Sequence, residues 1–231
     1  MFEKRSYEEE LMDDLESGGE IIDQALRELE TINRLLGGNQ VTINGLNKLL
    51  GNHPKAAPIV IADLGCGGGD IMILVAKWAR KKGYSIELKG YDANPNIVEY
   101  AKQNCAQYPE ISFYTEDIFS DDFKTNRYDV VICTLFTHHF KDEQLISIFN
   151  QFKTQAKIGV VINDLHRHWL AYHSIKLLTR LFSKSPMVQC DAPLSVRRAF
   201  RKDELQKIMN SAEISAFSLK WMWAFRWQLI F

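Results

Sequence analysis

A glycine-rich run, Asp63-Leu64-Gly65-Cys66-Gly67-Gly68-Gly69-Asp70, joins a short β-branched segment to a helical pattern. Glycines let the backbone turn sharply there and let a ligand lie directly against it, and the start of the following helix offers free N–H groups. The run is acidic at both ends. It therefore predicts a binding loop, and its charges indicate which ligand fits.

Two classes of nucleotide cofactor use such a loop. Nicotinamide and flavin sites follow the pattern GxGxxG/A, and here the sixth position counted from Gly65 is Asp70, whose charge would repel a pyrophosphate. S-adenosylmethionine (SAM) has no phosphate, and its amino group and sulfonium would give Asp63 a cationic partner. The charge pattern favours SAM.

Two more acids follow the next strand-like segments. Asp92 comes 27 positions after Gly65, where a carboxylate can accept hydrogen bonds from both ribose hydroxyls. Asp117 is placed to accept from an adenine amino group while Ile118 packs on the ring. Taken singly, the glycines could form only a tight turn, Asp63 could be a capping partner and Asp117 an ordinary loop carboxylate. An acid after each of three successive strands is more specific than any one of them.

On these residues the sequence resembles the class I SAM-dependent methyltransferases from about residue 59 to residue 164. The motifs that carry the resemblance are DLGCGGG, YDANP, EDIF and YDVVICTLFTHHF. The ending Thr137-His138-His139-Phe140 is most similar to bacterial small-molecule methyltransferases related to quinone-biosynthesis enzymes. The resemblance implies a cofactor site with these members: Asp63, Gly65, Cys66 and Gly67 at the methionine part, Asp92 and Ala93 at the ribose, Asp117 and Ile118 at the adenine, and Cys133 with Thr134 as the floor.

Histidines are the candidate catalytic bases. His138 and His139 follow the fourth strand, and His166 follows the fifth, so all three lie near the edge where open α/β sheets bind ligands. An imidazole that titrates near 6.5 can accept a proton from a phenol or enol nucleophile. Packing or capping roles for these rings remain open alternatives. The spacing HxHxxxxH after the fifth strand matches no metal motif, and we expect no metal ion.

The elements that must position these residues alternate between short apolar runs and helical patterns of about 10–15 residues. Such alternation predicts a parallel sheet covered by helices on both faces. Together with the resemblance, it gives an α/β fold: a Rossmann-like three-layer sandwich whose mostly parallel sheet ends in a C-terminal antiparallel hairpin. In the last segment Trp221, Trp223, Phe225 and Trp227 recur with period two, which predicts a strand with an aromatic face.

Two segments are expected to cover the site. Residues 1–55 form a helical cap, with one amphipathic helix over residues 20–36 and a second that begins after Thr42 as N-cap. Residues 56–231 form the methyltransferase domain, within which residues 165–199 form a helical lid. The apolar content of both segments suggests a hydrophobic or aromatic substrate.

The composition restricts the classes of binding partner and the cellular location that we expect. A formal net charge of -1 argues against a nucleic-acid partner, and the basic groups 77–82 and 197–202 are explained as solvated helix ends. The four cysteines form no CxxC pair, which fits a reducing compartment. We found no signal peptide and no membrane span in the sequence, so a cytoplasmic protein is expected.

The sequence therefore predicts an enzyme that transfers a methyl group from SAM to a small molecule. O-methylation is favoured over C-methylation of a quinone-like ring. An RNA methyltransferase, a nicotinamide dehydrogenase and a non-catalytic SAM-binding regulator remain as alternatives. Exposed aromatic residues of the covering segments could support a homodimer.

Overall fold

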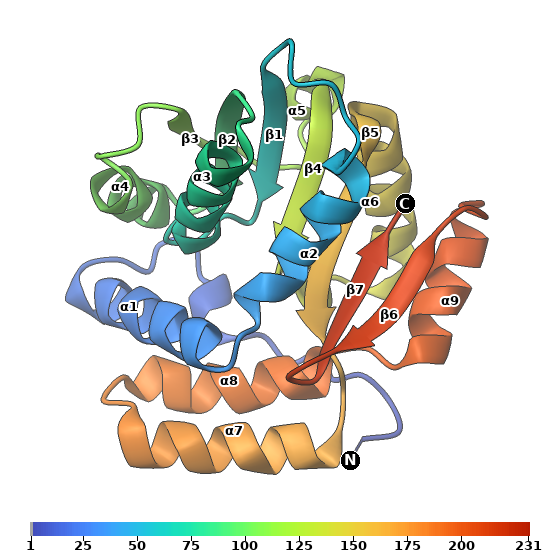
Figure 1. Ribbon diagram of the computed structural model, residues 1–231. Coiled ribbons are helices and arrows are strands. Elements are labelled where there is room, and N and C mark those ends of the chain that lie inside the picture. Colours follow the sequence, from blue (N-terminus) through green and yellow to red (C-terminus); the bar gives the residue numbers. More distant parts are fainter. Residues whose placement is uncertain (1) are drawn as a thin grey trace.

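A computed structural model describes residues 2–231 and shows one seven-stranded sheet between two layers of helices (Figure 1). The strand order is β3-β2-β1-β4-β5-β7-β6. The parallel strands are β1 (Ile59–Leu64), β2 (Ile86–Asp92), β3 (Ile111–Thr115), β4 (Tyr128–Thr134) and β5 (Ala156–Leu165). Strand β7 (Arg226–Ile230) is antiparallel to β5 and to β6 (Ser218–Met222). The predicted fold class is confirmed.

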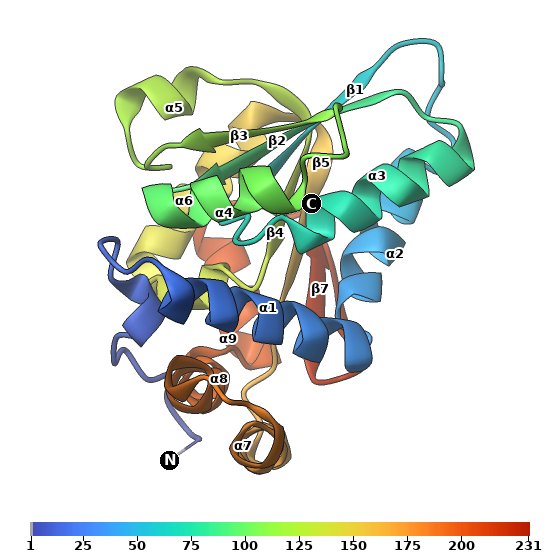
Figure 2. The same ribbon diagram turned by 90° about the vertical axis from the view of Figure 1, so that its left-hand side faces the viewer.

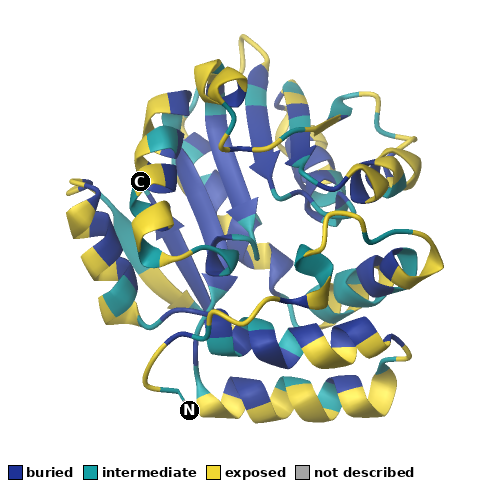
Figure 3. Cartoon of the chain, turned by 180° about the vertical axis from the view of Figure 1, so that it is seen from behind, coloured by how far each residue is buried: buried dark blue, intermediate teal, exposed yellow. Residues whose placement is uncertain are grey.

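The central strands of the sheet are buried on both faces (Figure 3). One helical layer contains α2 (Asn39–Leu50), α3 (Asp70–Lys82) and α4 (Pro95–Asn104), and the other contains α5 (Asp121–Thr125), α6 (Asp142–Gln155) and α9 (Lys202–Ser211). Along β4, Val130 and Ile132 belong to the first core and Val131 and Cys133 to the second, because successive side chains point to opposite faces. The central strands are therefore apolar on both sides.

Local signals set the helix ends beside the site. Helix α3 begins at Asp70, directly after Gly69 in the left-handed conformation. Helix α4 begins at Pro95, and the Asn94 side chain accepts hydrogen bonds from the backbone N–H groups of Asn96 and Ile97. The chain thus turns sharply at the carboxyl ends of β1 and β2, next to the strand-order reversal between β1 and β4.

A group of helices covers this carboxyl edge (Figure 2). A short 3₁₀ helix (Leu11–Asp13) leads to α1 (Glu20–Leu35), and α8 (Pro186–Arg198) packs between α1 and the outermost helix α7 (Trp169–Phe182) (Figure 1). Ile22 and Leu26 of α1 meet Met187 and Val188 of α8 in a separate small core. A second 3₁₀ helix (Thr137–His139) follows β4.

Three expectations differ from the structure. Helix α2 begins at Asn39, so Thr42 lies inside it, where its hydroxyl pairs with that of Thr134 at 2.9 Å. This helix packs in the sandwich layer against β5 and β7 rather than in a cap. The alternating aromatics do not form one strand face, because the chain turns between Met222 and Arg226 and sets Trp221 opposite Trp227 on paired strands.

Among residues 2–231, no helix combines the length and the apolar composition needed to cross a lipid bilayer.

Candidate active site

A cavity of about 640 Å³ opens at the carboxyl ends of β1, β2 and β4. The glycine loop forms its floor, and α1 with the residues before it forms the opposite wall. The site residues predicted from sequence that line it are Asp63, Gly65, Cys66, Gly67, Asp92, Ala93, Asp117, Ile118 and His139. Thr134 lines it as well. The topology therefore brings most of the predicted cofactor residues to one place.

The glycine loop is held by the end of β2. The backbone N–H groups of Gly65 and Cys66 both donate to the carbonyl of Tyr91, and that of Gly67 donates to Asp92 Oδ2 at 3.3 Å. Gly65 has φ of 68°, and a Cβ there would lie 2.3 Å from Cδ2 of Phe136. Glycine is thus required at this position both by the backbone conformation and by the ring packed on it.

Buried acidic side chains with raised pKa values line the cavity. Asp63 is fully buried, and its Oδ1 has no hydrogen-bond partner among residues 2–231. Burial, together with the neighbouring Asp70 and Asp92, raises the pKa of Asp63 well above its usual range. Burial and Glu30 raise the pKa of Asp70 to about 6. Among residues 2–231 none of these acids forms an ion pair, and a cationic ligand fits the site.

Asp92 sits between the loop and α4. Its two oxygens accept from the backbone N–H groups of Asn94 at 3.0 Å and Gly67 at 3.3 Å. Burial raises its pKa, although these two donors oppose the shift. Because a carboxylate has about four acceptor sites, Asp92 can still accept from two hydroxyl groups.

The outer end of the cavity is formed by residues 115–119. The Asp117 side chain is exposed and accepts from the backbone N–H of Phe119 at 2.9 Å, while Ile118 is buried beside it. An apolar side chain and an exposed acceptor lie together here, which suits an adenine ring. Cys133, in contrast, is buried in the core between the sheet and α6, so Thr134 occupies the floor without it.

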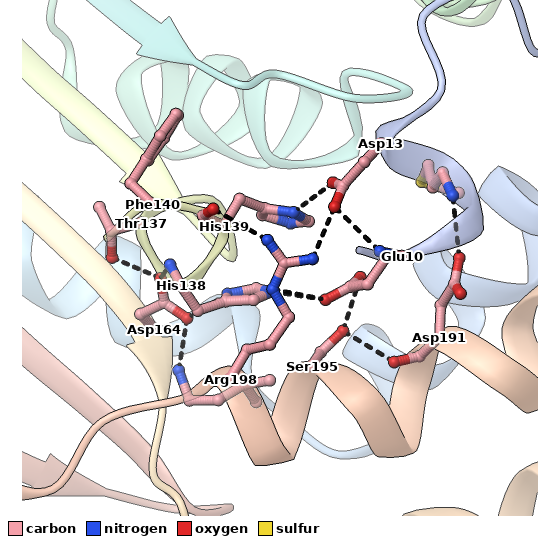
Figure 4. A network of polar contacts seen from close by, with 12 residues as sticks. Glu10, Asp13, Thr137, His138, His139, Phe140, Asp164, Asp191, Ser195 and Arg198 are labelled. Atoms are coloured by element: carbon pink, nitrogen blue, oxygen red, sulfur yellow. Dashed lines mark hydrogen bonds and ion pairs between the residues drawn. The ribbon is translucent and has the colours of Figure 1, made fainter. Parts of the chain in front are cut away.

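His139 and Asp13 form a close pair at the rim of the cavity (Figure 4). The imidazole Nδ1 lies 2.6 Å from Asp13 Oδ1. Burial would raise the pKa of Asp13, but the bonds from His139, the backbone of Glu10 and Arg198 outweigh it and hold the pKa below its usual range. An ionised Asp13 only accepts hydrogen bonds, so Nδ1 of His139 carries a hydrogen, and in a neutral ring Nε2 is the acceptor.

His138 has a different environment. Its Nδ1 lies 2.7 Å from Asp164 Oδ1, its Nε2 lies 3.6 Å from Glu10 Oε1, and the ring is buried. Burial disfavours the charged ring, yet the two carboxylates raise its pKa to about 9. At neutral pH the ring already carries its second proton, and it is not among the residues that line the cavity. This geometry fits a structural ion pair and leaves His138 without a free acceptor.

His166 lies away from the cavity. Its Nδ1 accepts from Trp221 Nε1 at 3.2 Å, and its ring meets Trp227 edge to face. Burial, followed by the charges of His168 and Arg167, lowers its pKa to about 4. The structure therefore does not bring the third candidate base to the site.

A second hollow of about 1100 Å³ adjoins the first. The two share Asp13, His139 and Gln144, so the histidine pair stands at their boundary. Pro186, Met187 and Arg198 line the second hollow and are the part of residues 165–199 that reaches the site. The lid expected from the sequence therefore contacts the neighbouring hollow rather than the first cavity.

The N-terminal segment supplies residues that the sequence analysis missed. Glu10 and Asp13 are held by Arg198, whose guanidinium also donates to the carbonyl of His139, and Ser195 donates to Glu10 Oε2 (Figure 4). Arg198 is buried in this network, so it is not part of a solvated helix end as predicted. These contacts join residues more than 50 positions apart, and no local pattern marks them.

Comparisons with known proteins agree with this geometry. Residues 61–159 match the family model described as "Methyltransferase domain". Over 110 residues, 46% of each chain, the sequence is 30% identical to a protein of Nostoc sp. named 2-phytyl-1,4-naphtoquinone methyltransferase. The match thus covers just under half the length of that curated relative.

Solved structures extend the likeness to most of the chain. Magnesium protoporphyrin IX methyltransferase from Synechocystis, with bound S-adenosylhomocysteine (SAH), superposes with a TM-score of 0.54 at 20% identity over 85% of this chain and 82% of that one. Human N-acetylserotonin methyltransferase in complex with SAM gives a TM-score of 0.58 at 18% identity over 90% and 55%. The chain therefore has the fold of class I methyltransferases, and residues 61–159 match the model of a methyltransferase domain.

Proposed function

We propose that this protein is a SAM-dependent methyltransferase that acts on a small, hydrophobic or aromatic molecule. The observation that carries the proposal is Asp63, a buried carboxylate with an unpartnered oxygen, beside Asp70 and Asp92 in one cavity. SAM has the cationic amino and sulfonium groups that such a site needs. The matching methyltransferase domain and the fold neighbours crystallised with SAM or SAH support the same cofactor.

The chain would hold the cofactor along the strand edge. Asp63, Gly65, Cys66 and Gly67 receive the methionine part, Asp92 and Ala93 the ribose, and Asp117 and Ile118 the adenine. When bound there, SAM supplies an activated methyl group. The protein contributes orientation and exclusion of water, which account for roughly 7–11 kcal/mol in model reactions.

His139 is the residue we assign as general base. It lies where the cofactor cavity meets the second hollow, and Asp13 holds its Nδ1. Nε2 accepts the proton that a phenol or enol loses as its oxygen takes the methyl group. This arrangement favours O-methylation, with C-methylation of a quinone-like ring as the second choice.

The second hollow would hold the methyl acceptor. Leu11, Ile21 and Met187 give it apolar walls, while His139 and Lys141 give it polar ones. Curated relatives named for methylation of a phytyl-naphthoquinone support an aromatic acceptor with an apolar tail. The cytoplasmic location, the homodimer and the absence of a nucleic-acid partner stay predictions.

Labelled SAM tests the proposal directly. The full chain is incubated with methyl-labelled SAM and a panel of alkylated phenols and hydroquinones, and products are identified by mass spectrometry.

In calorimetry, Asp92→Ala should weaken SAM binding about 10- to 100-fold, because it removes a charged acceptor of two hydrogen bonds. Asp122→Ala, which changes an exposed acid on α5, is the matched control. Unchanged affinity in Asp92→Ala, or preferential binding of NAD, would contradict the cofactor assignment, and binding without turnover on any acceptor would contradict catalysis.

A further inference from the structure

The outer face of α7 exposes large apolar side chains. Leu177, Leu181 and Phe182 are 59%, 64% and 78% exposed, and Trp169 and Leu170 at the start of the helix are exposed as well. Leu170, Leu177 and Leu181 recur at helical spacing and form one stripe. Figure 3 shows α7 as the outermost helix of the covering group, with a largely exposed outer face. An apolar stripe this long on an outer helix marks a contact surface.

The β6–β7 hairpin continues this surface. Trp223 at its turn is 68% exposed, and Trp221 is exposed on β6. A chain of rings links the hairpin to α7: Trp221 meets Phe225, Phe225 stacks on His168, and His168 lies against Trp169. We call the surface formed by Trp169, Leu170, Leu177, Leu181, Phe182, Trp221 and Trp223 the α7 face.

The charged residues of α7 have one sign. Lys176, Arg180 and Lys184 are exposed, and the first two form a basic stripe next to the leucines. From residue 165 to residue 190 the sequence contains no Asp or Glu. Glu28 of α1 meets the turn between α7 and α8, where its carboxylate is engaged by Ser183 and by the backbone N–H groups of Lys184 and Ser185. On α7 itself, the exposed leucines and aromatics are accompanied by basic and no acidic side chains.

We propose that the α7 face docks on an anionic lipid bilayer. A helix that lies in a membrane interface places apolar residues among the acyl chains while lysine and arginine reach the headgroups, and tryptophans favour the same depth. A second copy of the chain fits less well, because a two-fold contact would set each basic stripe against its own copy. Helix α7 packs on α8, whose residues line the second hollow, so docking would hold that hollow near the membrane surface.

Vesicle flotation of the full chain tests this assignment. We expect the protein to float with vesicles of phosphatidylcholine and phosphatidylglycerol and to bind pure phosphatidylcholine more weakly, with the difference lost at high salt. The pair Leu177→Ser and Leu181→Ser should lower the partition coefficient at least about tenfold, since two exposed leucines no longer enter the acyl region. Lys176→Gln and Arg180→Gln should each lower it about fivefold on anionic vesicles only.

Matched controls lie on other elements. Tyr114→Ser changes an exposed aromatic on β3 at the opposite sheet edge, and Lys102→Gln changes an exposed lysine on α4, so neither should alter partitioning. Circular dichroism confirms that each variant is folded. The proposal is overturned if the protein does not float with anionic vesicles, or if the α7 variants bind them like wild type. It is also overturned if sedimentation shows a dimer that the leucine variants dissociate, since a second copy would then cover the face.

Discussion

His139 and His138 are neighbours in sequence, yet their surroundings give them opposite properties. His138 lies between Asp164 and Glu10, which raise its pKa to about 9 against the effect of burial. His139 pairs with Asp13 at 2.6 Å and lines both hollows. One ring is therefore a buried cation at neutral pH, and the other lies at the boundary of the two hollows.

This difference predicts the effect of mutation. His139→Ala should lower kcat about 100-fold or more while the Kd for SAM changes little, because a general base acts only in the chemical step. Asp13→Asn should lower kcat less, since an amide no longer enforces the tautomer with Nε2 free. The control is His53→Ala, a half-buried histidine in the loop before β1. Steady-state kinetics with calorimetry would contradict the assignment if His139→Ala turned over at the wild-type rate.

The glycine loop shows what each glycine contributes. Gly65 and Gly67 both have positive φ, but a Cβ at Gly65 would lie 2.3 Å from the Phe136 ring, whereas the nearest atom to one at Gly67 lies 4.0 Å away. Gly67→Ala should therefore cost about 1–2 kcal/mol of unfolding free energy from backbone strain alone. Gly65→Ala should cost more, because the aromatic ring must also move. Urea unfolding of both variants measures the difference, and equal losses would show that Phe136 moves aside freely.

At the scale of whole elements, ion pairs and hydrogen bonds of charged side chains hold the N-terminal segment against the residues that follow β4, the end of β5 and α8. His138 is central to this connection, since it contacts Glu10 of the segment and Asp164 at the end of β5. Arg5 adds hydrogen bonds from the segment to the carbonyls of His138, Phe140 and Arg198. The covering wall of the cofactor cavity thus depends on a protonated ring.

Protein stability should depend on pH accordingly. The folded-state pKa of His138, about 9, lies above the unfolded value of 6.5, so its charge adds stability that is complete below pH 6.5 and is lost as pH rises through about 9. We expect a loss of about 2–3 kcal/mol between pH 7 and pH 10. Urea unfolding across this range measures it, with His138→Gln as the reference that should lack this component. A wild-type slope equal to that of the variant would show that His138 is neutral in the folded protein.

For the molecule as a whole, local patterns predicted the sheet and most of the cofactor cavity. The strand-and-helix alternation and the run around Gly65 are short-range signals, and the parallel topology brings Asp63, Asp92 and Asp117 to one edge without further information. The acids at positions 10 and 13 carried no such signal, because their partners lie more than 120 positions away. The position of His166 was not foreseen for a related reason. The period-two pattern of aromatic residues did not show where the C-terminal hairpin turns, and that turn places Trp221 against the His166 ring.

The cofactor cavity joins the strand edge, the glycine loop and the covering helix α1 in one surface, so a ligand there stabilises several elements together. A ligand at 100 times its Kd adds about 2.7 kcal/mol to the unfolding free energy. For a domain of this size, that corresponds to a rise in Tm of about 5–10 °C. We expect this rise with SAM and with SAH, none with NAD, and only about half of it or less with SAM in Asp92→Ala, whose weaker binding leaves SAM at a lower multiple of its Kd. The shift should also shrink in Leu26→Ala, because Leu26 lines the cavity and anchors α1 against α8, so its loss loosens the wall without touching an acid. A full shift in that variant would show that the strand edge alone binds the cofactor and that α1 takes no part.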